Sequence, residues 1–325
     1  MLTAESAMNT IPTIFNERQI NMTVLGGRQK PSHIAMDVAV ILLNSSGSHF
    51  RVQVLENLVT CGFSDIISLE PHRENRNIEE TAHRFPSVKF IVPLDTVTDG
   101  DMINIGMSET DASHVLVLRD SLAIPHGVVS PKLVEHVLKL DCYCVAPRLI
   151  DAAHGGVAVR SIPFAERGHL HMEMTAVVTE GAPTVYPFDI VGLYNREKFI
   201  RLGGFDYTIL SPYYQNMDLA LRSWLWGERT VISPSFLLSY AGAVPVETMT
   251  ADVTYLHCYL KNMLPVFKID HGVISPFSFF RFFYNSSCGF FESRRLFKDA
   301  VRWTTVNRYR FKTDIKHLVE NWGAV

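Results

Sequence analysis

The chain has 325 residues, of which 47% are hydrophobic and 19% are charged, and its formal net charge is −3. This composition is typical of a globular protein and excludes intrinsic disorder. The slightly acidic balance gives no reason to expect a nucleic acid as a partner. The length suits one large α/β domain with an appendage, or two small domains.

No basic segment followed by a long apolar run begins the chain, so we expect no signal peptide. No uninterrupted apolar stretch approaches the roughly 20 residues that span a bilayer. The five cysteines are scattered along the sequence, which favours a reducing compartment. We therefore expect a cytoplasmic protein, either free in solution or peripheral at the inner face of the membrane.

Residues 37–118 alternate between short apolar runs and helical segments. The continuous run Val38–Leu43 is typical of a buried parallel strand. Further strands are predicted over 65–70, 88–92 and 114–118, and helices over 52–61 and 100–109. This order predicts an α/β fold with a parallel nucleotide-binding sheet flanked by helices. Such sheets bind ligands at the carboxyl ends of their strands, so Asn44, Glu70 and Arg119-Asp120-Ser121 are expected around one crevice.

The rest of the chain is less regular. A helix is predicted from Pro131 to Leu140, a strand over 143–146, and short strands and loops over 151–186. Residues 231–234 are predicted to form a short strand and a turn, and the chain becomes helical from about Thr248. We divide it into an N-terminal extension (1–36), a main domain (37–245) and a helical C-terminal extension (246–325).

The most informative motif is Gly203-Gly204-Phe205-Asp206, followed by Tyr213-Tyr214-Gln215-Asn216-Met217-Asp218-Leu219-Ala220-Leu221-Arg222. This stretch resembles the acceptor-side signature of the family-2 glycosyltransferases, which have the GT-A fold. Other landmarks follow in the same order: the strand ending at Asn44, the strand ending at Glu70, and the helix segment 101–106. The resemblance covers about Asp37 to Tyr240.

The resemblance implies a donor site and an acceptor site. It implies that a nucleotide-diphosphate sugar binds near Asn44, Glu70 and Asn104, with Arg119 and Asp120 facing the diphosphate. It further implies that an unidentified acceptor is presented by Gly204, Phe205, Gln215 and Asn216.

The chain departs from the family where the catalytic base is expected. In the family, the positions of Gln215 and Asn216 usually hold Glu-Asp, and one of those carboxylates deprotonates the acceptor hydroxyl. Amide side chains cannot accept that proton near neutral pH. Asp218 and Asp206 are therefore the remaining candidates for a base, although either could instead cap a local segment.

A second departure affects the metal. The family presents Asp-x-Asp to a divalent cation, Mn or Mg, which neutralises the leaving diphosphate. Here the segment reads Leu118-Arg119-Asp120-Ser121, so the usual ligands are not present and no cofactor is assigned. Arg119 could supply part of the cation's charge or could be a solvated residue at a strand end. A later His of the family is also missing, and Lys261-Asn262 stands where the family has Arg-Asn on a C-terminal helix.

Two functions remain open. The leading one is transfer of a sugar from a nucleotide-diphosphate donor to an unidentified acceptor. The alternative is a catalytically inactive glycosyltransferase-fold protein that acts as a binding or assembly subunit, as three altered landmarks suggest. A nucleotidyltransferase is disfavoured because no glycine-rich phosphate loop follows the first strand.

The C-terminal extension is aromatic and basic. Phenylalanines crowd residues 277–297, and Arg294, Arg295, Lys298 and Arg302 follow or are interleaved with them. The preferred interpretation is a helical cap that covers the core or forms a homodimer interface. The alternative is an interfacial helix that contacts an anionic membrane surface.

Overall fold

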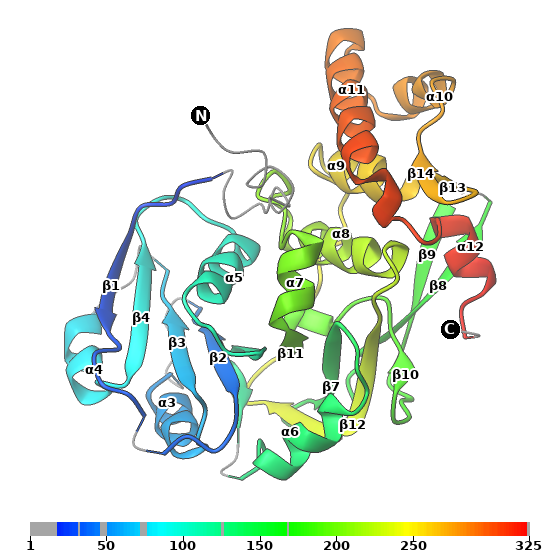
Figure 1. Ribbon diagram of the computed structural model, residues 1–325. Coiled ribbons are helices and arrows are strands. Elements are labelled where there is room, and N and C mark those ends of the chain that lie inside the picture. The colour runs from blue at the N-terminus through cyan, green and yellow to red at the C-terminus, as the bar shows by residue number, and fades with distance from the viewer. Residues whose placement is uncertain are drawn as a thin grey trace.

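The computed structural model describes residues 18–31, 33–45, 51–71, 77–124, 127–167 and 169–323. Its centre is a sheet of ten strands in the order β1-β4-β3-β2-β5-β11-β7-β12-β10, with the short β6 paired to β12 (Figure 1). The predicted mostly parallel α/β sheet with flanking helices is confirmed.

Four parallel strands form the half of the sheet that the sequence predicted best. They are β2 (Val38–Leu43), β3 (Asp65–Leu69), β4 (Val88–Pro93) and β5 (His114–Arg119). All six residues of β2 are buried, because β2 has β3 on one side and β5 on the other and helices on both faces. The parallel pairing brings the carboxyl ends of these strands to one edge.

The other half of the sheet is mixed. It contains β11 (Gly192–Asn195), β7 (Cys144–Ile150), β12 (Thr230–Tyr240), β10 (Ala182–Pro183) and β6 (Leu122–Ala123). β11 is antiparallel to both β5 and β7. The turn predicted at residues 233–234 is wrong: β12 continues to Tyr240, and its pairing with β7 shifts in register between Ser233 and Leu237. Pro234 lies within this irregularity, where a missing backbone donor is tolerated.

One strand comes from the predicted N-terminal extension. β1 (Met22–Gly26) pairs antiparallel with β4 and forms an edge of the sheet. Residues 1–17 of that extension lie outside the described residues.

Helices cover both faces of the sheet, and the alternation along β2 separates two cores. Val38, Val40 and Leu42 face α3 (Arg51–Thr60), α4 (Ile78–Arg84) and α6 (Pro131–Leu138). Ala39, Ile41 and Leu43 face the other layer. That layer contains α5 (Asp99–Ser108), α7 (Arg196–Leu202) and α8 (Pro212–Leu225).

The remaining elements lie beyond the sheet. β8 (Arg160–Glu166) and β9 (His169–Thr175) form a separate hairpin, as do β13 (Val266–Lys268) and β14 (His271–Val273), which interrupt the predicted helical region. The C-terminal helices are α9 (Tyr255–Cys258), a π-helical turn (Tyr259–Met263), α10 (Ser278–Asn285), α11 (Phe290–Asn307) and α12 (Ile315–Glu320). Among the described residues, no helix is both long and apolar enough to cross a bilayer.

Candidate functional site

The carboxyl ends of β2 and β3 hold a buried polar cluster. Asn44 Nδ2 donates to Ser68 Oγ over 2.8 Å and to Glu70 Oε1 over 3.1 Å. Arg51 Nη1, at the start of α3, lies 2.8 Å from Glu70 Oε2. Burial raises the pKa of Glu70 above its usual value, although Arg51 and Ser68 act in the opposite direction. Asn44 Oδ1 is buried and has no hydrogen-bond donor among the described residues.

Asp120, at the end of β5, is buried and held by the backbone. Ser45 donates its backbone N–H to Asp120 Oδ2 over 3.0 Å and its hydroxyl to Oδ1 over 2.8 Å. Both carboxylate oxygens therefore already accept hydrogen bonds. The structure brings Asn44, Glu70 and Asp120 to the same edge of the sheet, as the strand order predicted.

Arg119 is fixed between two carboxylates. Its Nη2 lies 2.7 Å from Asp99 Oδ2, at the start of α5, and its Nε lies 2.8 Å from Asp189 Oδ1. The hydroxyl of Tyr240 donates to Asp189 Oδ2 over 3.1 Å. Burial alone would lower the pKa of Arg119, but the two carboxylates raise it, so the guanidinium stays charged. Arg119 is thus an anchored cation and not a solvated strand end.

The backbone beside Arg119 is strained. Asp189 and Ile190 have φ angles of 54° and 64°, in the left-handed region, which aspartate tolerates but which a β-branched residue such as isoleucine rarely adopts. Two such residues in succession cost free energy that the surrounding contacts must offset. Burial raises the pKa of Asp189 even though Arg119 and Tyr240 lower it.

A further carboxylate, Glu247, lies next to this group. The hydroxyl of Tyr186 donates to Glu247 Oε2 over 2.7 Å, and the backbone of Asp189 also hydrogen-bonds to Glu247. Burial raises the pKa of Glu247 above its usual value, against the effect of both hydrogen bonds. The sequence analysis missed five residues because they come from loops, a strand end and a helix start with no recognisable spacing: Asp99, Tyr186, Asp189, Tyr240 and Glu247.

Asn104, on α5, holds the turn Gly203–Asp206 through two hydrogen bonds. Its Oδ1 accepts from the Phe205 N–H and its Nδ2 donates to the Phe205 carbonyl, both over 2.9 Å. Gly204 has a φ of 69°, and a Cβ added there would lie 2.6 Å from Asn104 Oδ1. The turn therefore requires glycine at this position, and Asn104 contacts the acceptor-side motif directly.

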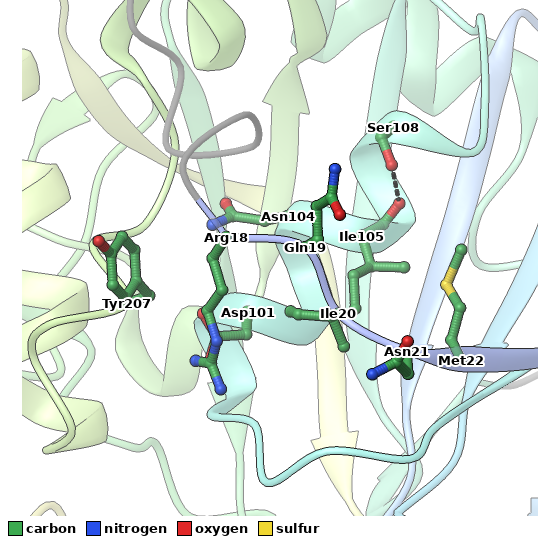
Figure 2. A pocket seen from close by; sticks show the side chains of 10 residues that line it. All are labelled: Arg18, Gln19, Ile20, Asn21, Met22, Asp101, Asn104, Ile105, Ser108 and Tyr207. Atoms are coloured by element: carbon green, nitrogen blue, oxygen red, sulfur yellow. Dashed lines mark hydrogen bonds and ion pairs between the residues drawn. The ribbon is translucent and has the colours of Figure 1, made fainter.

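Asn104 also lines a pocket of about 460 Å³ on the side of α5 that faces residues 18–22 (Figure 2). Arg18 crosses this pocket, with its Nη1 2.8 Å from Asp101 Oδ2, and Tyr207 lies opposite. The walls of this pocket include the segment 18–21 that precedes β1, and the α5 residues that line it lie on the side of the helix away from Asp99.

The two amides on α8 bind backbone groups. Gln215 Oε1 accepts from the Gly100 N–H over 3.1 Å, while its Nε2 donates to Thr98 Oγ1 over 2.9 Å and to the Asp206 carbonyl over 3.0 Å. Asn216 Nδ2 donates to the Pro187 carbonyl over 2.9 Å. Both side chains are buried, so they join α8 to neighbouring segments.

Asp218 belongs to a buried ion pair. Its Oδ2 lies 2.6 Å from Arg222 Nη2, and the exposed fractions of the two side chains are 0% and 3%. Its Oδ1 accepts from Asn262 Nδ2 over 2.7 Å. An acceptor hydroxyl has no access to a carboxylate enclosed in this way.

Asp206 is paired with Lys261 and also accepts two hydrogen bonds from Thr208, one from its backbone N–H and one from its hydroxyl. Burial alone would raise the pKa of Asp206, but Lys261 and Thr208 together lower it well below its usual range. A carboxylate with a lowered pKa is a weak base. The pair Lys261-Asn262, placed by resemblance, thus binds both aspartates that the sequence offered as bases.

The carboxylates around Arg119 do not form a site for a divalent cation. The described residues contain no group of three or more His, Cys, Asp or Glu side chains suited to hold a metal ion. Each carboxylate oxygen of Asp120 accepts a hydrogen bond from Ser45, and Asp99 and Asp189 are bound to Arg119. A cation would have to displace Arg119 to reach the latter two.

No protein-family model matches the chain, and no curated protein matches it in sequence. Solved structures do match. GalNAc-T7, solved with UDP, GalNAc and Mn²⁺, aligns with a TM-score of 0.55 at 11% identity, over 88% of this chain and 58% of that chain. TarS from S. aureus aligns with a TM-score of 0.49 at 10% identity, over 86% of this chain and 44% of that chain. The mannosyltransferase PcManGT from Pyrobaculum calidifontis, in complex with GDP-Man and Mn²⁺, aligns with a TM-score of 0.42 at 8% identity, over 76% and 66%.

The match to GalNAc-T7 shows the fold, which is that of the GT-A glycosyltransferases, with additional C-terminal helices. The chain spans 58% of the length of that structure. At 11% identity, the alignment shows architecture and does not assign a substrate.

Proposed function

We propose that this protein, related in its motifs to the family-2 glycosyltransferases, transfers a sugar from a nucleotide-diphosphate donor to an acceptor hydroxyl. The observation that carries the proposal is the anchored Arg119, at the carboxyl edge of a GT-A sheet. In the proposed arrangement the nucleotide lies near Asn44 and Glu70, and the diphosphate lies near Arg119 and Asp120.

Arg119 takes the place of the metal in this proposal. Because two carboxylates accompany one guanidinium, a diphosphate arriving there would meet a local negative charge unless a carboxylate took up a proton. The raised pKa of Asp189 favours proton uptake at that group. Protonation of Asp189 would leave Arg119 a stronger partner for phosphate oxygens.

Glu247 is proposed as the base, because Asp206 and Asp218 are consumed by ion pairs. In the transfer, the bond between the anomeric carbon and the phosphate oxygen breaks, and the nucleoside diphosphate leaves with the electron pair. The acceptor oxygen bonds to the anomeric carbon, and its proton passes to Glu247. The raised pKa of Glu247 suits a group that accepts a proton near neutral pH.

The alternative, a glycosyltransferase-fold binding or assembly subunit without activity, is supported by a specific observation. Gln215, Asn216 and Asp218 all serve contacts within the protein, so α8 offers no catalytic group. A transferase would cleave a bound sugar donor, whereas a binding subunit would hold it unchanged.

An assay for nucleoside diphosphate released from UDP-, GDP- and TDP-sugars distinguishes the transferase from the binding subunit. Measurable turnover that is lost in Glu247→Gln, while donor binding is retained, is the expected result for a transferase. Binding without turnover in the native chain would support the binding subunit. An active Glu247→Gln variant would remove Glu247 from the proposed mechanism.

A further inference from the structure

The hairpin formed by α10 and α11 lies apart from the sheet, at the top of the molecule in Figure 1. Its inner face is a small core that includes Phe282, Leu296 and Phe297. The ring centroid of Phe279 lies 5.4 Å from that of Phe297, so α10 and α11 pack through aromatic contacts. One face of each helix is therefore buried within the hairpin.

The opposite side carries five exposed aromatic residues, which we call the aromatic tip: Phe277, Phe280, Tyr284, Phe290 and Phe291. Their exposed fractions are 83%, 60%, 80%, 48% and 84%. Ring contacts through Phe279 and Phe283 join Phe280, Tyr284, Phe290 and Phe291 into a continuous surface. A contiguous aromatic surface of this kind is unfavourable in water and marks a contact site.

Basic side chains accompany the tip. Residues 278–302 contain five basic residues, Arg281, Arg294, Arg295, Lys298 and Arg302, and only two acidic ones, Glu292 and Asp299. This balance contrasts with the net negative charge of the whole chain. None of the five basic side chains forms an ion pair with any of the described residues, and all five are exposed.

Along α11, the exposed aromatic residues come first and the basic residues follow toward the C-terminal end of the helix. Phe291 begins the exposed side of the helix, and Arg294, Lys298 and Arg302 follow at spacings of three and four residues, which keeps them on one side. At 1.5 Å of rise per residue, the three basic positions lie roughly 5–16 Å from Phe291 along the helix axis. Aromatic rings would thus enter a bilayer boundary first, and long basic side chains would lie at the level of the headgroups.

We propose that the α10–α11 hairpin docks on the surface of an anionic phospholipid bilayer through its aromatic tip and flanking basic residues. Charge complementarity selects this occupant over a second copy of the chain. A symmetric dimer would bring the same face of both copies together and place the five basic residues of each against the other five. Anionic lipids attract each of those side chains, and the rings supply the apolar contact.

Sedimentation of the full chain with vesicles tests this proposal. Phosphatidylcholine vesicles with about 30% phosphatidylserine should bind the protein about tenfold or more tightly than pure phosphatidylcholine vesicles, and salt should weaken the binding. The triple variant Phe280→Ser/Tyr284→Ser/Phe291→Ser should lose binding. The matched variant Val246→Ser/Ile269→Ser, which changes residues 91% and 97% exposed outside the hairpin, should retain it.

A charge-reversal variant tests the role of the basic side chains separately. Arg294→Glu/Lys298→Glu should abolish the preference for phosphatidylserine, whereas Lys132→Glu, at an exposed position of α6, should not. Equal binding to both vesicle types, no binding, or binding unaffected by the triple variant would overturn the proposal. Concentration-dependent dimerisation that the triple variant removes would assign the tip to a protein interface and also overturn it. Nucleotide binding by the same samples is a separate readout, so failure here does not bear on the proposed transferase function.

Discussion

Arg119 Nε lies 2.8 Å from Asp189 Oδ1, and this contact joins the end of β5 to the strained loop that precedes β11. The loop and the strand end are 70 residues apart in sequence. Replacement of Arg119 should therefore change two measurable quantities, the free energy of unfolding and the affinity for a nucleotide.

Replacement of Arg119 by Gln should destabilise the fold at neutral pH. Asp99 and Asp189 would be left without a cation, at a cost of about 2–4 kcal/mol in the free energy of unfolding. The expected cost is smaller than for a fully buried ion pair, because the side chains of Arg119 and Asp99 are 19% and 27% exposed. Urea unfolding measures the change, with Arg201→Gln, whose exposed pair with Glu197 is worth less than about 1 kcal/mol, as the control. Equal effects of the two substitutions would contradict the anchoring role.

Asp218→Asn should act on stability before it acts on chemistry. The substitution leaves Arg222 buried without its counter-ion, and we expect a loss of about 3–5 kcal/mol in the free energy of unfolding. Thermal and urea unfolding measure this, with the exposed Glu197→Gln as the control. A stable Asp218→Asn variant that lost only turnover would instead identify Asp218 as a base.

Restoring the family's acidic pair should not restore its chemistry. In the double variant Gln215→Glu/Asn216→Asp, carboxylates would face the carbonyls of Asp206 and Pro187, which now accept hydrogen bonds from the amides. Each lost bond with an unpaired buried acceptor costs about 1–3 kcal/mol. Donor turnover and urea unfolding of the double variant check this, with Asn321→Asp on the exposed end of α12 as the control. A gain in turnover without loss of stability would refute the structural role of the two amides.

Glu247 should govern the pH dependence. Its raised pKa in the folded chain means that turnover, which needs the ionised form, rises with pH through a midpoint above the usual carboxyl range. Stability changes with pH in the opposite direction, because the folded chain binds the Glu247 proton more tightly than the unfolded chain does. This proton binding stabilises the fold fully below the ordinary carboxyl pKa, and the stabilisation is lost as the pH rises through the folded-state pKa. Glu247→Gln should flatten that part of the stability curve and remove the rising limb of the rate profile. An unchanged rate profile in an active variant would exclude Glu247 as the base.

The strands of the parallel half could be predicted because their residues are buried on both faces. Val38–Leu43 is apolar throughout and has the predicted bounds, and the ends of β3, β4 and β5 differ from the predicted ones by a single residue. The later strands could not be predicted in the same way. β12 passes through Ser233 and Pro234, which are ordinary turn residues, and continues only because β7 pairs with it on both sides of the shift in register.

The site residues also divide into those that could be predicted from the sequence and those that could not. Asn44, Glu70 and Asp120 follow recognisable strands, so their common edge was predictable. The partners of Arg119 were not, since Asp99 is the first residue of α5 and Asp189 lies in the loop after Pro187, and neither position has a chemical signature by itself. Likewise, the sequence offered Asp206 and Asp218 as candidate bases or caps, whereas Lys261 and Arg222 bind them in the folded chain.

In the proposed function, a nucleoside diphosphate binds at Arg119 without a metal. Calorimetric titration of the protein with uridine, guanosine and thymidine diphosphates, first with chelator and then with Mn²⁺, measures this binding. We predict saturable binding of one nucleotide in chelator, accompanied by proton uptake and weakened about tenfold or more in folded Arg119→Gln but not in Arg201→Gln. Binding that required Mn²⁺, or no binding of any of the three nucleotides, would contradict the account.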